Sequence, residues 1–241
     1  MKTNSKLLLI PLLIIFTAMG VPQKLREMNY HAYLKSDKEA WIQNVAYANK
    51  LYQEEPSDES LFQLALTEYG LLNVTMADND KKLFSDYADD CQERLESLVE
   101  SKKFGAEAKA LLSGVYGFKI AYSPLKGMFY GPKSSTLLDQ AMEENPSSPI
   151  VLKLYASNQY FTPEMWGGNK DLALKAFKKS TEYFGKNNQE KSWMNLDNLA
   201  WIGKIYQEEG QPEIAKLTWK KALEIEPNFY WVSKGLLPTL N

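Results

Sequence analysis

The residues that most often carry chemistry are scarce in this chain. His31 is the only histidine and Cys91 is the only cysteine. A nucleophile activated by a histidine would have to use His31, which lies beside Tyr30 in a weakly patterned segment and is interpreted as a surface or capping residue. Cys91 falls among apolar residues at helical spacing, so we expect a small buried side chain. One cysteine cannot form an intrachain disulfide, so stability has to come from packing.

Four carboxylates follow one another closely, at Asp86, Asp89, Asp90 and Glu93. They could hold a hard cation, but such a cation prefers loop oxygens as well, and a solvated helix face is the expected interpretation. We predict no catalytic residue, no metal site and no cofactor. Paired carboxylates for glycoside hydrolysis are defined by their separation in space, so an all-helical hydrolase stays open as an alternative.

Length and charge bound the class of protein. The chain has 241 residues, of which 44% are hydrophobic, and this is enough to bury a substantial core. Its formal net charge is only -2, without the clustered basic excess of a nucleic-acid surface. We therefore expect no nucleic-acid partner.

The first 20 residues have the pattern of a secretory signal peptide. Lys2 and Lys6 precede an unbroken apolar run at 7–16, and Gly20 offers a small residue at the cleavage point. The run is short for a bilayer span, and no cysteine for lipid attachment follows it. We expect export to a bacterial periplasm or beyond the cell, with no stable membrane span after cleavage. A retained anchor is the alternative.

Residues 196–229 carry a complete helical-repeat pattern. Apolar, small and proline residues recur at the separations of an antiparallel helix pair of about 34 residues. Gly210 and Pro212 end the first helix and begin the second. The small residues at 203 and 215 are expected where the two helices cross closely. The matching residues are Leu199, Ile202, Gly203, Tyr206, Ala215, Trp219, Ala222 and Pro227.

This pattern resembles the tetratricopeptide repeat (TPR) family. With the leader and the Trp166-Gly167-Gly168-Asn169 turn, the chain is similar in style to secreted bacterial TPR-like proteins. The resemblance implies an all-α fold, a right-handed superhelical α-solenoid of stacked antiparallel helix pairs. It also implies that the first helix of each repeat lines a concave binding face.

Two earlier repeats have looser spacing and an insertion between their helices. The insertions lie at 123–132 and 162–169, and the prolines and glycines of the first are expected to exclude a continuous helix. Asn169 is suited to cap the helix that follows.

The N-terminal part shows helical stripes at 37–54, 61–72 and 80–100. We predict roughly eight or nine helices, with no convincing strand. The expected parts are the signal peptide at 1–20, a divergent helical region at 21–105, TPR-like repeats at 106–229 and a tail at 230–241.

The concave face supplies the first candidate binding residues. In the last repeat they are Asp197, Lys204 and Gln207, and only Lys204 fits the basic clamp that the family uses for acidic peptide tails. Equivalent positions in the two preceding repeats are Leu111, Val115, Phe118, Tyr155 and Gln159. Apolar positions such as these can instead be core.

The insertions supply a second set of candidates, the aromatic anchors Tyr122, Phe129, Tyr130 and Trp166. Large apolar side chains among proline and glycine are costly to expose without a reason. Either they bind a ligand or partner, or they pack on each other across adjacent repeats.

The sequence thus favours an exported, noncatalytic TPR-like scaffold or adaptor that binds a protein or peptide partner. The alternative is a periplasmic small-ligand-binding component that works with a transporter. The chain also looks like the helical-repeat components of tripartite transporters, although it lacks their lipid-accepting cysteine.

We expect the mature protein to begin at or close to Val21, because the basic, apolar and small-residue segments lie in the order that export requires. N-terminal sequencing of the native protein checks this. An intact Met1 on a cytoplasmic species would contradict it.

Overall fold

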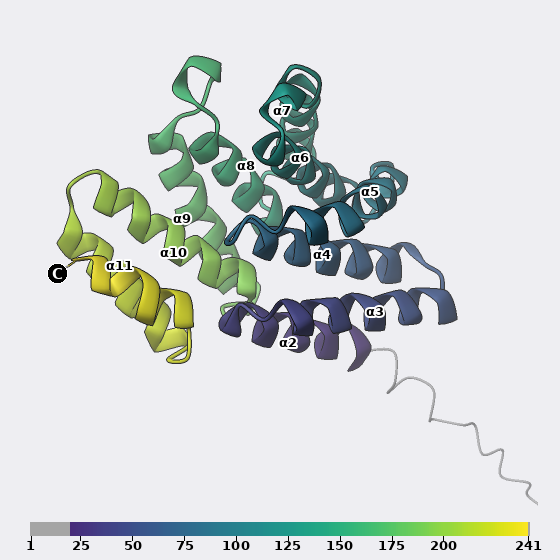
Figure 1. Ribbon diagram of the computed structural model, residues 1–241, viewed down its shortest axis with the longest axis horizontal. Coiled ribbons are helices and arrows are strands. Elements are labelled where there is room, and N and C mark those ends of the chain that lie inside the picture. Colours follow the sequence, from purple (N-terminus) through teal and green to yellow (C-terminus); the bar gives the residue numbers. More distant parts are fainter. Residues whose placement is uncertain (1–19, 241) are drawn as a thin grey trace, which may run out of the picture.

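The computed structural model describes residues 20–240, which are almost entirely helical and contain no strand (Figure 1). The predicted signal peptide lies outside these residues except for Gly20. The described α-helices are α2 (Gly20–Lys35), α3 (Lys38–Glu54), α4 (Asp58–Thr75), α5 (Lys81–Leu98), α6 (Gly105–Tyr122), α7 (Gly127–Glu144), α8 (Pro149–Phe161), α9 (Lys170–Lys186), α10 (Trp193–Glu208) and α11 (Pro212–Ile225). Short 3-10 helices lie at Pro124–Lys126, Glu164–Trp166 and Leu237–Leu240, and a π-helix lies at Trp231–Leu236.

The helices pair into antiparallel hairpins that stack side by side. The even-numbered helices are called inner here, because each contacts the next even-numbered helix, and the odd-numbered partners are called outer. Burial explains the division: α10 has eleven buried residues, whereas its outer partner α11 has three. An outer helix needs only one apolar stripe, while an inner helix is covered on several sides. The predicted all-α, TPR-like stack is confirmed.

The N-terminal ends of several helices are fixed by polar side chains. Asp37, Asp80 and Ser148 each accept a hydrogen bond from the backbone N–H three residues on. Asn169 does the same for Leu172 N–H at 2.9 Å, as the sequence predicted. These caps satisfy donors that the first turn of a helix leaves unpaired.

Two sequence expectations about the helices are wrong. Ten α-helices are described instead of eight or nine, because the segment around His31 forms α2 despite its weak pattern. The segment 123–132 is mostly helical, since α7 begins at Gly127 and contains Pro132. Pro132 has no backbone N–H to donate to the carbonyl of Met128. Because Met128 is exposed near the start of α7, water can donate to that carbonyl instead.

The last hairpin is built around Trp219 and not around a contact between its two small residues. The indole of Trp219 is fully buried and donates from Nε1 to the carbonyl of Ala200 at 3.0 Å. A Cβ added to Gly203 would lie 2.1 Å from that same nitrogen, so Gly203 makes room for the ring. Ala215 is also buried, but the atoms nearest to Gly203 all belong to Trp219.

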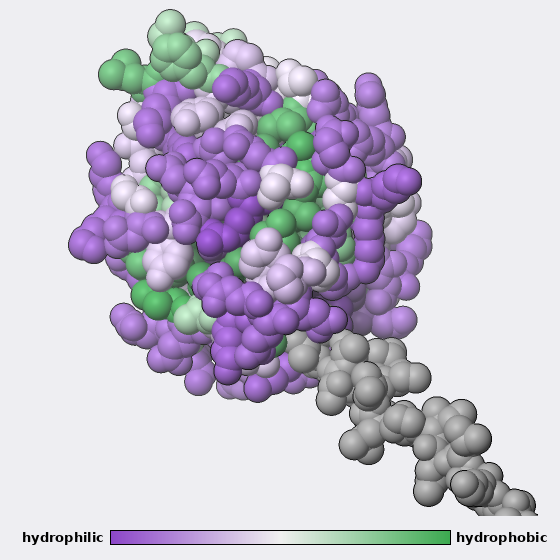
Figure 2. Space-filling view, turned by 90° about the vertical axis from the view of Figure 1, so that its right-hand side faces the viewer, coloured by the Kyte–Doolittle hydropathy of each residue, from purple (hydrophilic) through white to green (hydrophobic). Residues whose placement is uncertain are grey.

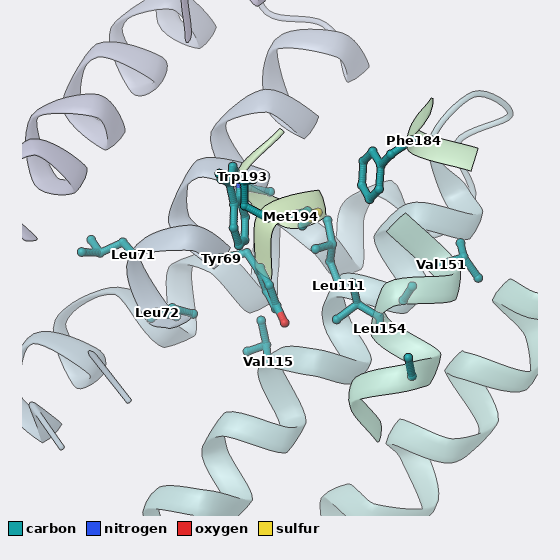
Figure 3. Packing of buried hydrophobic residues seen from close by; sticks show 14 of the residues in the cluster. Tyr69, Leu71, Leu72, Leu111, Val115, Val151, Leu154, Phe184, Trp193 and Met194 are labelled. Atoms are coloured by element: carbon teal, nitrogen blue, oxygen red, sulfur yellow. The ribbon is translucent and has the colours of Figure 1, made fainter. Parts of the chain in front are cut away.

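The row of inner helices closes on itself, because the first of them, α2, contacts the last, α10. The hydroxyl of Tyr33 donates to Asp197 at 2.6 Å, and the rings of Trp41 and Trp193 meet edge to face at 5.7 Å. Figure 3 shows Tyr69, Leu111, Leu154 and Trp193, which come from four inner helices, converging on one core. The concave side of the stack is therefore filled with side chains.

We predict that Gly203→Ala destabilises the protein by about 1–3 kcal/mol, since the new methyl group overlaps the Trp219 indole. Gly117→Ala is the matched control: it lies in helix α6, has no atom within 4 Å of its Cβ position, and should stabilise the helix by about 0.5–1 kcal/mol. Urea unfolding measures both. Equal midpoints for the two variants would show that the packing of Gly203 is wrongly described.

Candidate binding surface

The concave-face candidates are mostly core. Leu111 and Val115 are fully buried, and Phe118 is half-buried with its ring 5.2 Å from that of Tyr69. Tyr155 is half-buried and packs against the hydrophobic core. The expected open groove is absent along these inner helices, because the closed row covers their facing sides.

Asp197 was expected on an exposed face, and this expectation is wrong. Its side chain is only 7% exposed and forms an ion pair with the equally buried Lys153 of α8. It also accepts the hydrogen bond from Tyr33. Burial and the negative charge of Asp197 raise the pKa of the Tyr33 hydroxyl well above its usual value. Asp197 therefore joins three inner helices instead of facing a partner.

The other two candidates on α10 are partly accessible. Lys204 places its ammonium group 5.6 Å from the ring centre of Trp201. The amide of Gln207 donates to the hydroxyl of Thr239 at 2.9 Å, which holds the C-terminal turn against α10. Of the predicted concave set on this helix, Lys204 is the one that stands beside an aromatic surface.

The aromatic candidates of the insertions divide into two kinds. Tyr122 is structural, since its hydroxyl donates to the carbonyl of Thr75 at 2.8 Å and its ring lies 4.3 Å from that of Phe84. Tyr130 stacks on Tyr116 at 4.7 Å. In contrast, Phe129 and Trp166 are 72% and 70% exposed, so neither packs as a core residue.

The residues considered for chemistry are dispersed. Cys91 is fully buried, and burial raises the pKa of its thiol, so the nucleophilic thiolate is disfavoured. His31 is exposed on α2 beside the ring of Tyr30. The carboxylates of Asp86, Asp89 and Asp90 bind Lys82, Lys119 and Arg94 respectively. Within residues 20–240, no three histidine, cysteine or acidic side chains come together to hold a metal ion.

Four aromatic side chains form a continuous surface cluster, called the aromatic surface below. Tyr160 and Phe161 end α8, Trp201 lies on α10, and Trp231 follows α11. The ring of Trp201 lies 5.1 Å from Tyr160, 4.9 Å from Phe161 and 5.6 Å from Trp231. Phe161 is 60% exposed and the other three are half-buried.

Charged groups hold the aromatic surface in place. Glu208 accepts hydrogen bonds from the Tyr160 hydroxyl at 2.6 Å and from Lys170 at 2.7 Å. Burial opposes ionisation of Glu208, but these two hydrogen bonds outweigh it and the pKa of the carboxyl is lowered. The ammonium groups of Lys170 and Lys204 lie over the rings of Tyr160 and Trp201, both at 5.6 Å. The cluster is thus preorganised and has a charged rim.

The turn after α8 is tightly specified. Gly168 has no room for a side chain, since a Cβ there would lie 1.7 Å from the carbonyl oxygen of Thr162. Gly167 adopts φ +95°, which favours glycine. The N–H of Asn169 donates to the carbonyl of Gln159 at 2.9 Å. Because these contacts fix the backbone of the turn, the side chain of Trp166 stays exposed to solvent.

Three members of the aromatic surface, Tyr160, Trp201 and Trp231, were not among the candidates predicted from the sequence. Trp201 follows Asp197 by four residues and precedes Lys204 by three, so the same helical periodicity places it on the face already chosen. That signal could have found it.

Two cavities lie elsewhere, around α5, α6 and α7. One, of about 460 Å³, is lined by apolar residues such as Leu112 and Leu137, and the other, of about 350 Å³, is polar and includes Lys109 and Glu144. Their linings share no residue with the aromatic surface. None of the described helices is long and apolar enough to cross a membrane.

No protein-family model and no curated protein matches the sequence. The structure is similar to that of a thermophilic TPR protein from Thermus thermophilus, with a TM-score of 0.60 and 17% identity over 91% of this chain and 98% of that chain. It is also similar to the HusA haemophore from Porphyromonas gingivalis, with a TM-score of 0.61 and 19% identity over 79% of this chain and 93% of that chain. These likenesses show a TPR-like helical fold.

We predict that Lys153→Met destabilises the protein by about 3–5 kcal/mol, because it leaves the charge of Asp197 buried without its cation. Adding Asp197→Asn should recover part of this loss. Lys170→Met, which breaks the exposed pair with Glu208, should cost about 1 kcal/mol or less. Similar urea midpoints for Lys153→Met and Lys170→Met would contradict the structural role of the buried pair.

Proposed function

We propose that this chain is an exported, noncatalytic TPR-like protein that binds a protein partner through the aromatic surface. The observation that carries the proposal is the position of Phe161: it is 60% exposed, yet it lies against Trp201 and Tyr160 in a defined arrangement. Tryptophan and tyrosine dominate the binding energy of protein interfaces.

Preorganisation supports binding at this surface. Tyr160 is fixed by Glu208, and Trp201 contacts aromatic rings from two other segments. Side chains that are already ordered lose less conformational entropy when a partner binds. The Lys170, Lys204 and Glu208 rim adds polar contacts of both signs. This mixture favours a partner with an apolar anchor and a mixed-charge border over an acidic peptide tail.

Export and the lack of catalysis are further parts of the proposal. The pattern of residues 1–20 supports a cleaved leader and a periplasmic or secreted location. The single cysteine is fully buried, which suits an oxidising compartment because it is shielded from intermolecular pairing. The two structural neighbours, a TPR protein and a haemophore, support a binding role over an enzymatic one.

A second candidate function is the carriage of a planar, apolar small molecule, as a periplasmic component that serves a transporter. The aromatic surface favours it, since exposed rings can stack on a flat ligand. The likeness to the HusA haemophore makes haem a suitable probe.

We expect Phe161→Ala to weaken partner binding by about 2 kcal/mol or more, a change of roughly thirtyfold in Kd, because a hot-spot ring is lost from the interface. Its melting temperature should stay close to that of the parent, since the ring is mostly exposed. A partner captured from a periplasmic extract, with affinities measured by calorimetry, provides the test.

Phe129→Ala is the matched control, because it truncates another exposed phenylalanine, near the start of α7 and outside the aromatic surface. Equal affinities of the parent, Phe161→Ala and Phe129→Ala for the partner would contradict the proposal. Titration with haemin tests the second candidate function. The carrier would be favoured if haemin gave a saturable absorbance change that Phe161→Ala weakens, and if no protein partner were sensitive to that substitution.

A further inference from the structure

Two hairpin turns present large apolar side chains to solvent. The 3-10 helix after α6 exposes Leu125 (84%), and the first turn of α7 exposes Met128 (76%) and Phe129 (72%). The turn between α8 and α9 exposes Met165 (86%) and Trp166 (70%). These two groups are called the apolar tips. Neither belongs to the aromatic surface defined above.

Both tips project from the same edge of the stack. Helices α6 and α8 are adjacent inner helices of consecutive hairpins, so their C-terminal ends and the turns that follow lie at one edge (Figure 1). Figure 2 shows a mostly hydrophilic face with a group of hydrophobic residues protruding at its upper edge. Apolar side chains at a protruding edge are unusual for a protein surface and mark an interaction site.

Two exposed lysines lie beside the first tip, next to the exposed carboxylate of Asp89, which pairs with Lys119. Between Glu107 and Asp139 the sequence contains no acidic residue, but it contains Lys109, Lys119, Lys126 and Lys133. Lys109 and Lys119 pair with Glu144 and Asp89, whereas Lys126 and Lys133 are exposed next to the tip. The second tip carries the exposed acidic residues Glu164 and Asp171 beside Lys170, which pairs with Glu208, so it has no positive excess. The positive charge that suits an anionic surface therefore lies at the first tip, on Lys126 and Lys133.

The shape of the tips points to a fluid partner. Their side chains protrude from turns and do not line either described cavity. A folded protein would need a deep pocket for each protruding side chain, whereas the interfacial region of a bilayer accepts phenylalanine, methionine, leucine and tryptophan without one. Exposed lysines beside them attract anionic headgroups.

We propose that this edge docks on the surface of a bilayer that contains anionic phospholipid. The apolar tips enter the headgroup region, and Lys126 and Lys133 contact lipid phosphates. No described helix crosses the bilayer in this arrangement.

The test uses residues 21–241, since the apolar leader would itself bind lipid. Among the described residues, the buried core extends from Leu25 to Leu236. Vesicles of phosphatidylethanolamine and phosphatidylglycerol are compared with vesicles of phosphatidylcholine by co-sedimentation. We expect binding to the anionic vesicles, and weaker binding at high salt.

The triple variant Leu125→Ser, Met128→Ser, Phe129→Ser should lose about tenfold or more in the vesicle partition coefficient, because it removes the apolar contribution of the first tip. The variant Lys126→Gln, Lys133→Gln should lose on the order of tenfold for anionic vesicles alone. Met165→Ser with Trp166→Ser should weaken binding to both kinds of vesicle. Leu217→Ser, which truncates an exposed leucine on α11, is the matched control and should bind as the parent does.

Failure of the parent to sediment with anionic vesicles would overturn the proposal, as would equal binding by the triple variant. If the parent does not bind vesicles and the triple variant no longer binds a protein partner, the membrane proposal is overturned in favour of a protein interface. Melting curves show whether the triple variant folds, and if it does not, Leu125→Ser and Phe129→Ser singly carry the test. Phe161→Ala should bind vesicles normally, so this test is independent of the aromatic surface.

Discussion

Asp197 carries a charge that is almost completely removed from water, and the arrangement of the inner helices depends on it. Its cation comes from the neighbouring helix α8 and its hydroxyl donor from α2, so the first and last hairpins must meet for the carboxylate to accept its second hydrogen bond. The aromatic contacts of Trp41 with Trp193 and of Tyr33 with Phe229 surround the same junction. An open solenoid of this sequence would leave that charge and those rings only partly covered.

Closure of the inner row changes where a partner can bind. A concave groove is the usual working face of stacked helix pairs, but here it is filled by residues such as Tyr69 and Leu154. Accessible aromatic and apolar side chains such as Phe161 and Trp166 lie instead at the end of an inner helix and in the turn after it, and others, such as Leu217, lie on outer helices. The proposed aromatic surface accordingly lies at the C-terminal end of α8 and on α10, outside the filled concave side.

Local pattern made most of the fold predictable, and contacts between distant segments explain what it missed. The last hairpin could be recognised because Trp219, Ala222 and Pro227 recur at fixed separations. Helix α2 was overlooked because its buried positions include the polar Asn29, which interrupts the apolar stripe that Leu25 and Ala32 would otherwise form. Periodicity placed Asp197 and Lys204 on one helical face, but only the three-dimensional closure decides that the N-terminal part of this face is covered and that the part around Trp201 is open.

Contact between α2 and α10 also removes the free ends that stacked repeats normally have. In a linear array each repeat touches only its neighbours, so the terminal repeats fray first and the array can unfold in steps. In this chain the terminal hairpins are neighbours of each other, joined by Tyr33, Asp197 and Phe229. Unfolding of either terminal hairpin would expose core residues of the other. The hairpins should therefore unfold as one cooperative unit, and the terminal helices should exchange their amide hydrogens more slowly than those of a linear array.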